Sequence, residues 1–340
     1  MVEDFSVRSR SFSEKGLHLE TGGTAVLENI NHRISELLDQ LETVVIGKRE
    51  PSRFLLSALI AGGHVLLNDV PGVAKTRLVR ALAQLSSLSF ARIQGTPDLL
   101  PTEVTGGMVY LPQTGSLSFR QGPVFHHLVL VDEINRATPR TQAALLECME
   151  EHQVSADGVT YRLPEPFMVM ATQNPVEMEG TFPLPEAQLD RFLLSFSLGY
   201  PTFSEEITIA AKFSGSDSLG ELSPVLTSSD LLSLRRAADD VLVNDAVLDY
   251  VVRLCRATRE STRIRLGASP RATIQLVRVL KSYALTLGRS YVTPDDVKTV
   301  APVALSHRLV LGADAAMERM APERAIQSLL DTVNVPVESV

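Results

Sequence analysis

A short segment of the chain, residues 64–76, carries the side chains best suited to bind a nucleoside triphosphate. Its first residues are apolar enough to form one buried strand, and a turn containing Pro71 and Gly72 precedes Lys75 and Thr76. A helix that begins after such a turn presents free backbone N–H groups and a positive dipole to phosphate. The lysine then supplies charge to the outer phosphates, and the threonine hydroxyl binds Mg²⁺. The segment therefore predicts a phosphate-binding loop between a strand and a helix.

This loop departs from the usual G-x-x-x-x-G-K-[ST] pattern at both glycine positions. Asp69 stands at the first and Ala74 at the second, which leaves Gly72 to adopt a positive φ angle. We expect Ala74 to keep a negative φ, because a side chain is strained in the left-handed region. A lysine that merely begins a solvated helix is the alternative. The candidate phosphate contacts are Asp69, Val70, Pro71, Gly72, Val73, Ala74, Lys75, Thr76 and Arg77.

A second apolar run, residues 127–133, ends in two adjacent carboxylates. Residues 128–131 are typical of a central parallel strand buried on both faces, and Asp132 and Glu133 follow directly. Two carboxylates at the end of a buried strand are costly unless a cation lies nearby. We therefore expect Asp132 to bind Mg²⁺ together with Thr76, and Glu133 to activate the attacking water. An ordinary acidic strand end in solvent is the alternative.

A third apolar run, residues 167–172, is followed by Asn174. An Asn-Pro pair after a strand is by itself only a turn signal. Here, however, the amide follows the third of three successive apolar strands, whose carboxyl ends are expected to share one edge of a parallel sheet. At that edge Asn174 is expected to orient the attacking water and to respond to the γ-phosphate.

Two arginines are candidates for contact with phosphate oxygens, which planar guanidinium groups bind well. Arg191 lies directly before a short apolar run, and its spacing does not tell whether it acts on its own subunit or on a neighbour. Arg271 falls in the first turn of a helix with Ser269 as its expected N-cap and Pro270 as its first residue. A cation there is unfavourable unless an anion is brought to it. A surface arginine that reaches away from the helix end is the alternative.

Taken together, these motifs resemble the MoxR family of AAA+ ATPases. The resemblance extends from about residue 30 to about residue 312 and rests on segments 69–76, 130–137, 171–175, 184–192 and 267–271. It implies binding and hydrolysis of ATP with Mg²⁺ in a homo-oligomer, expected to be a hexameric ring. It also implies chaperone-like remodelling of protein clients, often with a partner that carries a von Willebrand factor A domain.

The resemblance also assigns a role to each motif. The implied roles are Walker A for Lys75 and Thr76, Walker B for Asp132 and Glu133, sensor 1 for Asn174, a trans-acting arginine finger for Arg191, and sensor 2 for Arg271. Arg136, just past Walker B, is the next candidate for the finger. Residues Val45, Ile46 and Gly47 look like the loop that touches adenine in related ATPases. We expect Lys75, Asp132, Asn174 and Arg271 to converge on one anionic ligand.

Two insertions carry hairpin signals. Residues 106–124 contain two alternating runs around a set of turn residues, and residues 152–163 are centred on Asp157-Gly158, a strong two-residue turn signal. They look like the helix-2 insert and the hairpin before sensor 1 of this branch of AAA+ proteins. The family resemblance favours loops that face a pore or a substrate, and idle surface hairpins are the alternative.

The order of the elements predicts the fold class. Strands alternate with helices up to about residue 201, which indicates an α/β P-loop NTPase with a parallel sheet and helices on both faces. We assign residues 24–201 to this nucleotide-binding domain, which begins with an amphipathic helix over residues 24–43. Beyond it, apolar stripes at helical spacing predict a small all-helical lid domain over residues 202–335. Residues 1–23 are expected to be a mobile tail.

Composition narrows the class of protein further. Hydrophobic residues make up 44% and charged residues 21% of the 340 residues, as in ordinary globular proteins. Because no apolar run is long enough to span a bilayer and residues 1–23 lack the apolar core of a signal peptide, we expect a cytoplasmic location. A net charge of −8 and the absence of Trp favour protein over nucleic acid as substrate. A DNA-remodelling motor, a nucleotide-gated scaffold with weak hydrolysis and a metal-chelatase motor remain alternatives.

Overall fold

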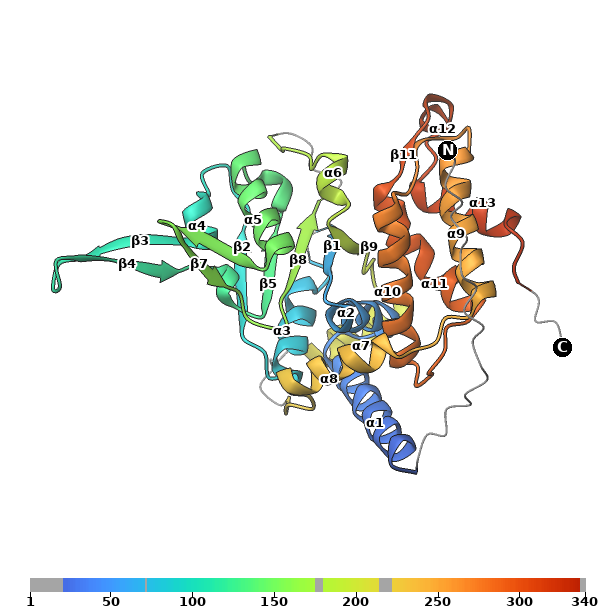
Figure 1. Ribbon diagram of the computed structural model, residues 1–340, viewed down its shortest axis with the longest axis horizontal. Coiled ribbons are helices and arrows are strands. Elements are labelled where there is room, and N and C mark those ends of the chain that lie inside the picture. Colours follow the sequence, from blue (N-terminus) through green and yellow to red (C-terminus); the bar gives the residue numbers. More distant parts are fainter. Residues whose placement is uncertain (1–20, 71, 175–179, 214–221, 337–340) are drawn as a thin grey trace, which may run out of the picture.

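The computed structural model describes residues 21–70, 72–174, 180–213 and 222–336 of the chain. Figure 1 shows an α/β part on one side of the molecule and a group of helices on the other, with a long two-stranded hairpin that projects from the α/β part. Within the described ranges, no helix combines the length and the apolar character needed to cross a bilayer.

The centre of the α/β part is a five-stranded sheet with the order β2-β5-β8-β1-β9. Every neighbouring pair is parallel. The parallel sheet expected from the sequence is therefore confirmed, and the carboxyl ends of all its strands lie along one edge. The strands are β1 (His64–Asn68), β2 (Phe90–Gln94), β5 (Leu128–Asp132), β8 (Met168–Gln173) and β9 (Phe192–Phe196).

Helices cover both faces of this sheet. Successive side chains of a strand point to opposite faces, and those of β5 are buried on both. In β5, Leu130 packs into the hydrophobic cluster that contains α3, whereas Val131 packs into the cluster that contains α5. The first face is covered by α1 (Thr21–Val44), α2 (Arg49–Ala61) and α3 (Lys75–Leu85). On the second face lie α4 (Pro101–Thr105), α5 (Pro139–Glu151), and the short helices η1 (Pro123–Phe125), η2 (Ile134–Arg136) and α6 (Glu186–Leu189).

The first helix, α1, begins earlier than its apolar pattern indicates. The sequence predicts a helix over residues 24–43 and a tail before it, but the helical backbone starts at Thr21. Three residues assigned to the tail therefore belong to the helix, since the helical backbone begins before the first apolar position of the pattern. Residues 1–20 lie outside the described part of the chain.

An antiparallel hairpin is present at each of the two positions where the sequence predicts one. The first is formed by β3 (Gly106–Leu111) and β4 (Ser116–Gln121), and the second by β6 (Gln153–Ala156) and β7 (Val159–Arg162). The two hairpins touch, because the ring of Phe119 stacks on that of Tyr161 with centroids 4.1 Å apart and planes 16° apart. The base of the projecting hairpin is thus packed against the second hairpin (Figure 1).

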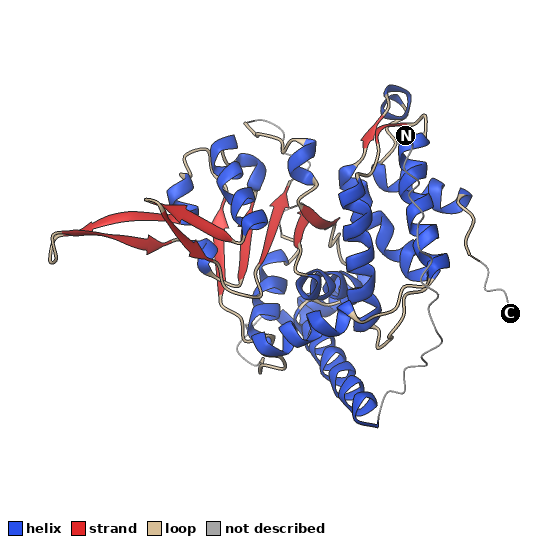
Figure 2. Ribbon diagram, viewed as in Figure 1, coloured by secondary structure: helices blue, strands red, loops and turns tan. Residues whose placement is uncertain are grey.

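The C-terminal part is helical, as predicted, with one addition. Figure 2 shows that it consists of helices with only a small amount of strand, which lies at one end. That strand is an antiparallel pair of β10 (Ile264–Leu266) and β11 (Val310–Leu311), too short to be evident from sequence periodicity. The helices are α7 (Phe203–Phe213), α8 (Ser228–Asp239), α9 (Asp245–Glu260), α10 (Pro270–Thr286), α11 (Pro294–Leu305), η4 (Ser306–Arg308), α12 (Ala313–Met317) and α13 (Pro322–Thr332).

The two parts share one hydrophobic cluster. Buried side chains of α2, such as Leu59, belong to the same cluster as Leu234 of α8 and Leu280 of α10. An ion pair between Arg33 of α1 and Asp230 of α8, 2.7 Å long, adds to this contact and lowers the pKa of Asp230 to about 2. The boundary between residues 201 and 202 stays a prediction, because packing continues across it.

Candidate nucleotide site

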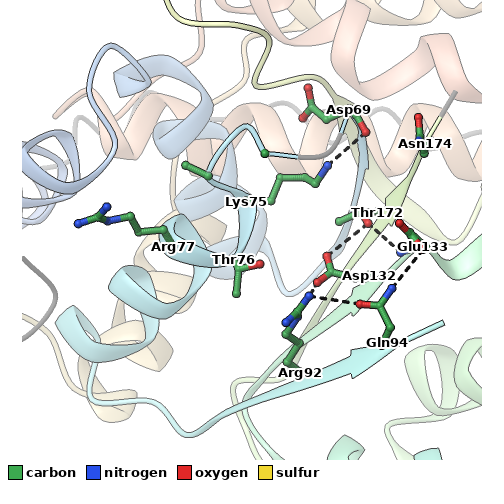
Figure 3. Close-up of a pocket in the computed structure, with 12 residues that line it drawn as sticks. Asp69, Lys75, Thr76, Arg77, Arg92, Gln94, Asp132, Glu133, Thr172 and Asn174 are labelled. Carbon is green, nitrogen blue, oxygen red and sulfur yellow. Dashed lines mark hydrogen bonds and ion pairs between the residues drawn. The ribbon is translucent and has the colours of Figure 1, made fainter. Parts of the chain in front are cut away.

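A cavity of about 350 Å³ lies at the carboxyl edge of the sheet, beside the start of α3. Figure 3 shows Lys75 and Thr76, at the start of α3, opposite side chains from the ends of β2, β5 and β8, whereas Arg77 points away from them. It is lined by Asp69, Gly72, Ala74, Lys75, Thr76, Arg77, Arg92, Gln94, Asp132, Glu133, Thr172 and Asn174. The three strand ends that the sequence analysis expects to meet, those of β1, β5 and β8, thus lie around one place, and β2 adds Arg92 and Gln94.

A second cavity, of about 340 Å³, lies on the other side of the loop before α3. Gly72, Ala74 and Arg77 line both cavities, which are therefore adjacent. The second cavity is lined by Val44, Val45, Ile46, Lys48, Gly72, Val73, Ala74, Arg77, Gly199, Tyr200, Pro201, Glu206 and Ile209. Its mostly aliphatic and aromatic walls suit the flat face of a purine. Gly47 is not among the described residues that line it.

The loop itself is more strained than its sequence suggests. Gly72 has a φ of +89°, as expected, but Ala74 also lies in the left-handed region with a φ of +64°. The expectation of a negative φ at Ala74 is therefore wrong. An alanine in this region costs about 1–2 kcal/mol relative to the right-handed conformation. The strain is retained because Ala74 is the N-cap of α3 and turns the chain from the loop into the helix. Pro71 lies outside the described residues.

The aspartate at the first glycine position has a structural task. Asp69 is 3% exposed, and its carboxylate accepts hydrogen bonds from the hydroxyl of Ser197 at 2.5 Å and from the backbone N–H groups of Leu198 and Gly199 at 2.8 and 3.1 Å. Asp69 therefore ties the start of the loop to the segment after β9. Those three donors stabilise the carboxylate, whose charge still acts on Lys75.

Lys75 stands at the start of α3 with its ammonium group over the loop. Nζ donates to the backbone oxygens of Asp69 and Val70, at 3.2 and 2.9 Å. Burial lowers the pKa of Lys75, and the charges of Asp69, Asp132 and Glu133 oppose that shift. The ammonium is thus held by weak backbone acceptors, from which an anionic phosphate is able to draw it.

The two carboxylates after β5 are held in different ways. Asp132 is 7% exposed, and its Oδ2 accepts a hydrogen bond from Arg92 Nε at 2.6 Å while Oδ1 accepts one from the Thr172 hydroxyl at 3.4 Å. Glu133 has a φ of +55°, and its backbone N–H donates to the same hydroxyl at 2.9 Å. Thr172, on the neighbouring strand β8, therefore holds the backbone of Glu133 and contacts the side chain of Asp132.

The side chain of Glu133 points into the cavity between two partners. Its Oε2 accepts from Gln94 Nε2 and from Arg136 Nη1, both at 3.2 Å. Arg136, the second candidate for the finger, is thus paired with the carboxylate of its own chain. Asn174 is buried on the same side of the sheet and lines the same cavity.

Sequence reasoning missed three residues of this cavity. Arg92 and Gln94 lie at alternate positions of β2, and Thr172 lies near the end of β8. Polar side chains two residues apart on a strand share one face, which is a signal that the sequence does contain. That signal is not decisive, because only the strand order places β2 next to the two carboxylates.

Arg191 and Arg271 lie near each other, beside Glu150. Neither is among the described residues that line the two cavities. Arg191 Nε and Arg271 Nη1 pair with the two carboxylate oxygens of Glu150, at the end of α5, at 3.1 and 3.0 Å. This corrects the expectation that Arg271 shares one pocket with Lys75. The reason is that the start of α10 faces the end of α5, where Glu150 supplies the anion.

The helix start around Arg271 is otherwise as predicted. Ser269 is the N-cap of α10, with its hydroxyl accepting from the backbone N–H of Ala272 at 3.1 Å, and Pro270 is the first residue. The Ser269 hydroxyl also donates to Asp190 at 3.3 Å, and the buried Arg308 lies 3.5 Å from the other oxygen of that carboxylate. The segment that carries Arg191 is therefore fastened to the helical part of the chain.

Comparison with known proteins gives this geometry a family. Residues 64–194 match the family model of the ATPases associated with various cellular activities (AAA), and residues 256–329 match the AAA lid domain. The chaperone MoxR1 of Mycobacterium tuberculosis is 41% identical over 93% of this chain and 85% of its own length. The protein YeaC of Bacillus subtilis is 45% identical over 92% of this chain and 98% of its own length.

Two further relatives extend the comparison. The protein MoxR of Methylorubrum extorquens is 31% identical over 92% of this chain and 98% of its own length. A crystal structure of a candidate ATPase from Cytophaga hutchinsonii superposes with a TM-score of 0.87, at 38% identity, and covers 93% of this chain and 98% of that one. With the family match, the lid match and the cavity at the sheet edge, the chain belongs to the MoxR family of AAA+ ATPases.

Proposed function

We propose that the chain binds ATP with Mg²⁺ across the two adjacent cavities and hydrolyses it. The observation that carries this proposal is the meeting of Lys75, Thr76, Asp132, Glu133 and Asn174 around one cavity at the sheet edge. The donor set fits the ligand: a lysine and a helix start suit phosphates, and hydroxyl and carboxylate oxygens suit Mg²⁺.

The residues divide the chemistry among them. Thr76 and Asp132 supply the oxygen ligands for Mg²⁺, which when bound neutralises the charge that develops on the phosphates. Lys75 leaves its backbone acceptors to hold the outer phosphates. Glu133 accepts a proton from the attacking water, and Asn174 orients that water. The base occupies the second cavity, against Val45, Ile46 and the other apolar side chains of its walls, with Gly47 in the adjoining turn.

A homo-oligomeric ring, expected to be a hexamer, completes the site in this proposal. Arg191 belongs to a neighbour's site, which is supported by its absence from the described lining of its own chain's cavity and by its pairing with Glu150 beside Arg271. Arg271 is then a second candidate for contact with that neighbour. The protein clients, a partner with a von Willebrand factor A domain and the cytoplasmic location stay predictions. The overall charge of −8 continues to disfavour nucleic acid.

We propose that hydrolysis drives chaperone-like remodelling of proteins. Support comes from MoxR1, which is described as a chaperone. Exposed apolar side chains on the projecting hairpin also fit contact with protein, and they include Val109, Tyr110 and Leu117.

A comparison of phosphate release by wild type and Glu133→Gln tests the hydrolytic role. Loss of the general base is expected to slow release by about 10²–10⁴-fold while nucleotide binding is kept. Glu151→Gln, an exposed position at the end of α5, removes the same charge away from the cavity and is expected to leave the rate unchanged. Equal and measurable rates in wild type and Glu133→Gln contradict the role. Equal rates near zero favour the nucleotide-gated scaffold instead.

A further inference from the structure

Arg92 occupies the centre of β2, beside the strand that ends in the two carboxylates. In the register of the sheet, Arg92 lies opposite Leu130 and Gln94 lies opposite Asp132. Its guanidinium follows the face of the sheet toward the cavity: Nε donates to Asp132 at 2.6 Å, and Nη2 donates to the side-chain oxygen of Gln94 at 3.2 Å (Figure 3).

This ion pair compensates a buried charge. The side chain of Asp132 is only 10% exposed, whereas that of Arg92 is 52% exposed. A carboxylate with so little solvent requires a nearby cation or strong donors. The Thr172 hydroxyl, at 3.4 Å, is a weak donor, and Lys75 donates to backbone oxygens of its own loop. Among the described residues, Arg92 is the ion-pair partner of Asp132.

The same oxygen is needed for the metal in the proposed function. Asp132 serves there as a ligand of Mg²⁺, and a guanidinium nitrogen 2.6 Å from Oδ2 takes the space that the metal or its water requires. The two cations repel each other at that oxygen, so Arg92 and Mg²⁺ compete for Asp132. The side chain of Arg92 is half-exposed, so its guanidinium has room to change rotamer. Lys75 and Thr76 lie across the cavity from it (Figure 3).

We propose that Arg92 is an exchangeable counter-ion of Asp132. In the nucleotide-free chain it neutralises the buried carboxylate. When Mg²⁺ and a nucleoside triphosphate bind, Arg92 gives up Asp132 and transfers its guanidinium to the outermost phosphate, for which its planar donors are suited. Arg92 thereby distinguishes triphosphate from diphosphate and sets the Mg²⁺ concentration at which the nucleotide complex forms. This inference rests on the proposed ATP site and adds a residue to it.

The test measures binding rather than turnover. In a Glu133→Gln background, fluorescent ATP and ADP analogues are titrated into the full-length protein with Arg92, with Arg92→Gln and with Arg92→Lys. Arg92→Gln is expected to raise the Kd of the triphosphate about tenfold, as for the loss of one charge-assisted hydrogen bond, and to change that of the diphosphate by less than about twofold. Arg92→Lys keeps the charge without the planar fork and is expected to fall between.

The Mg²⁺ dependence gives a second readout. Thermal unfolding is followed in the presence of ADP at increasing Mg²⁺, and Arg92→Gln is expected to reach half-maximal stabilisation at a Mg²⁺ concentration several-fold lower than the Arg92 protein. Arg256→Gln, which removes an exposed arginine of α9, is the matched control and is expected to shift neither readout.

Each outcome bears on the inference separately from the proposed function. An unchanged ratio of the two Kd values together with an unchanged Mg²⁺ midpoint in Arg92→Gln overturns the role of Arg92, while the ATP site stands. If Arg92→Gln does not fold, the same two readouts on Arg92→Lys decide. If the Arg92 protein binds neither nucleotide, the proposed function falls and the inference falls with it.

Discussion

Asp69→Gly is the substitution on which the motif pattern and the structure disagree most clearly. It restores the glycine that the phosphate-loop pattern calls for at this position, so pattern reasoning expects a neutral or improved protein. The structure expects the opposite, because the Asp69 carboxylate joins the loop to the segment after β9 through Ser197, Leu198 and Gly199.

The size of the effect depends on the contacts that the three donors lose. Leu198 is 4% exposed, so its N–H is left without an acceptor and away from water, which costs about 1–3 kcal/mol. Ser197 and Gly199 are nearer to solvent and add less than about 1 kcal/mol together, because water replaces part of what they lose. Glycine also increases the conformational freedom of the unfolded chain by about 0.5–1 kcal/mol. We expect a total loss of about 1.5–5 kcal/mol in the free energy of unfolding.

Urea denaturation and amide exchange measure this loss. At a slope of about 3 kcal/mol/M, the urea midpoint of Asp69→Gly is expected to fall by about 1 M, and exchange at the Leu198 amide is expected to accelerate. Asp157→Gly is the matched control, since Asp157 already has a φ of +50° in an exposed hairpin turn and is expected to shift the midpoint little. A midpoint for Asp69→Gly equal to or above that of wild type refutes the reasoning.

Three further predictions address other parts of the account. Burial lowers the pKa of His64 to about 4, so His64 is protonated in the unfolded chain before it is protonated in the folded one. Stability is therefore lost as the pH falls from about 6.5 toward 4, and the loss at pH 5 is about 2 kcal/mol. His64→Gln is expected to reduce the fall in the urea midpoint between pH 7 and pH 5. Arg191→Ala is expected to lower phosphate release by the assembled protein about a thousandfold or more, and a wild-type rate would show that Arg191 is not the finger. A double-mutant cycle of Phe119→Ala and Tyr161→Ala is expected to give a coupling of about 0.5–1.5 kcal/mol in the free energy of unfolding, and strictly additive effects would show that the stack does not join the hairpins.

The sequence predicts the cavity well where local order determines position. Lys75, Asp132 and Asn174 each come after an apolar run, and parallel strands bring the residues at their carboxyl ends to one edge of the sheet. The same reasoning finds both hairpins, because Asp157-Gly158 and the turn residues from Pro112 to Gly115 are local signals.

The features that the sequence could not supply depend on strand order and on packing between distant segments. The pairing of Arg92 with Asp132 requires β2 to be the neighbour of β5, and nothing in either strand states that. The place of Arg271 depends on how α10 meets the end of α5 at Glu150. The positive φ of Ala74 reflects the path of the whole loop, which outweighs the preference of one residue.

The central claim is that one nucleotide and one metal ion occupy the cavity at the sheet edge. The most direct measurement is anomalous scattering from crystals of Glu133→Gln grown with Mn²⁺ and a non-hydrolysable ATP analogue. We predict one strong Mn²⁺ peak beside Thr76 and Asp132, with triphosphate density at Lys75 and base density against Val45 and Ile46. A Mn²⁺ peak and nucleotide density elsewhere on the molecule, with this cavity empty, would contradict the account.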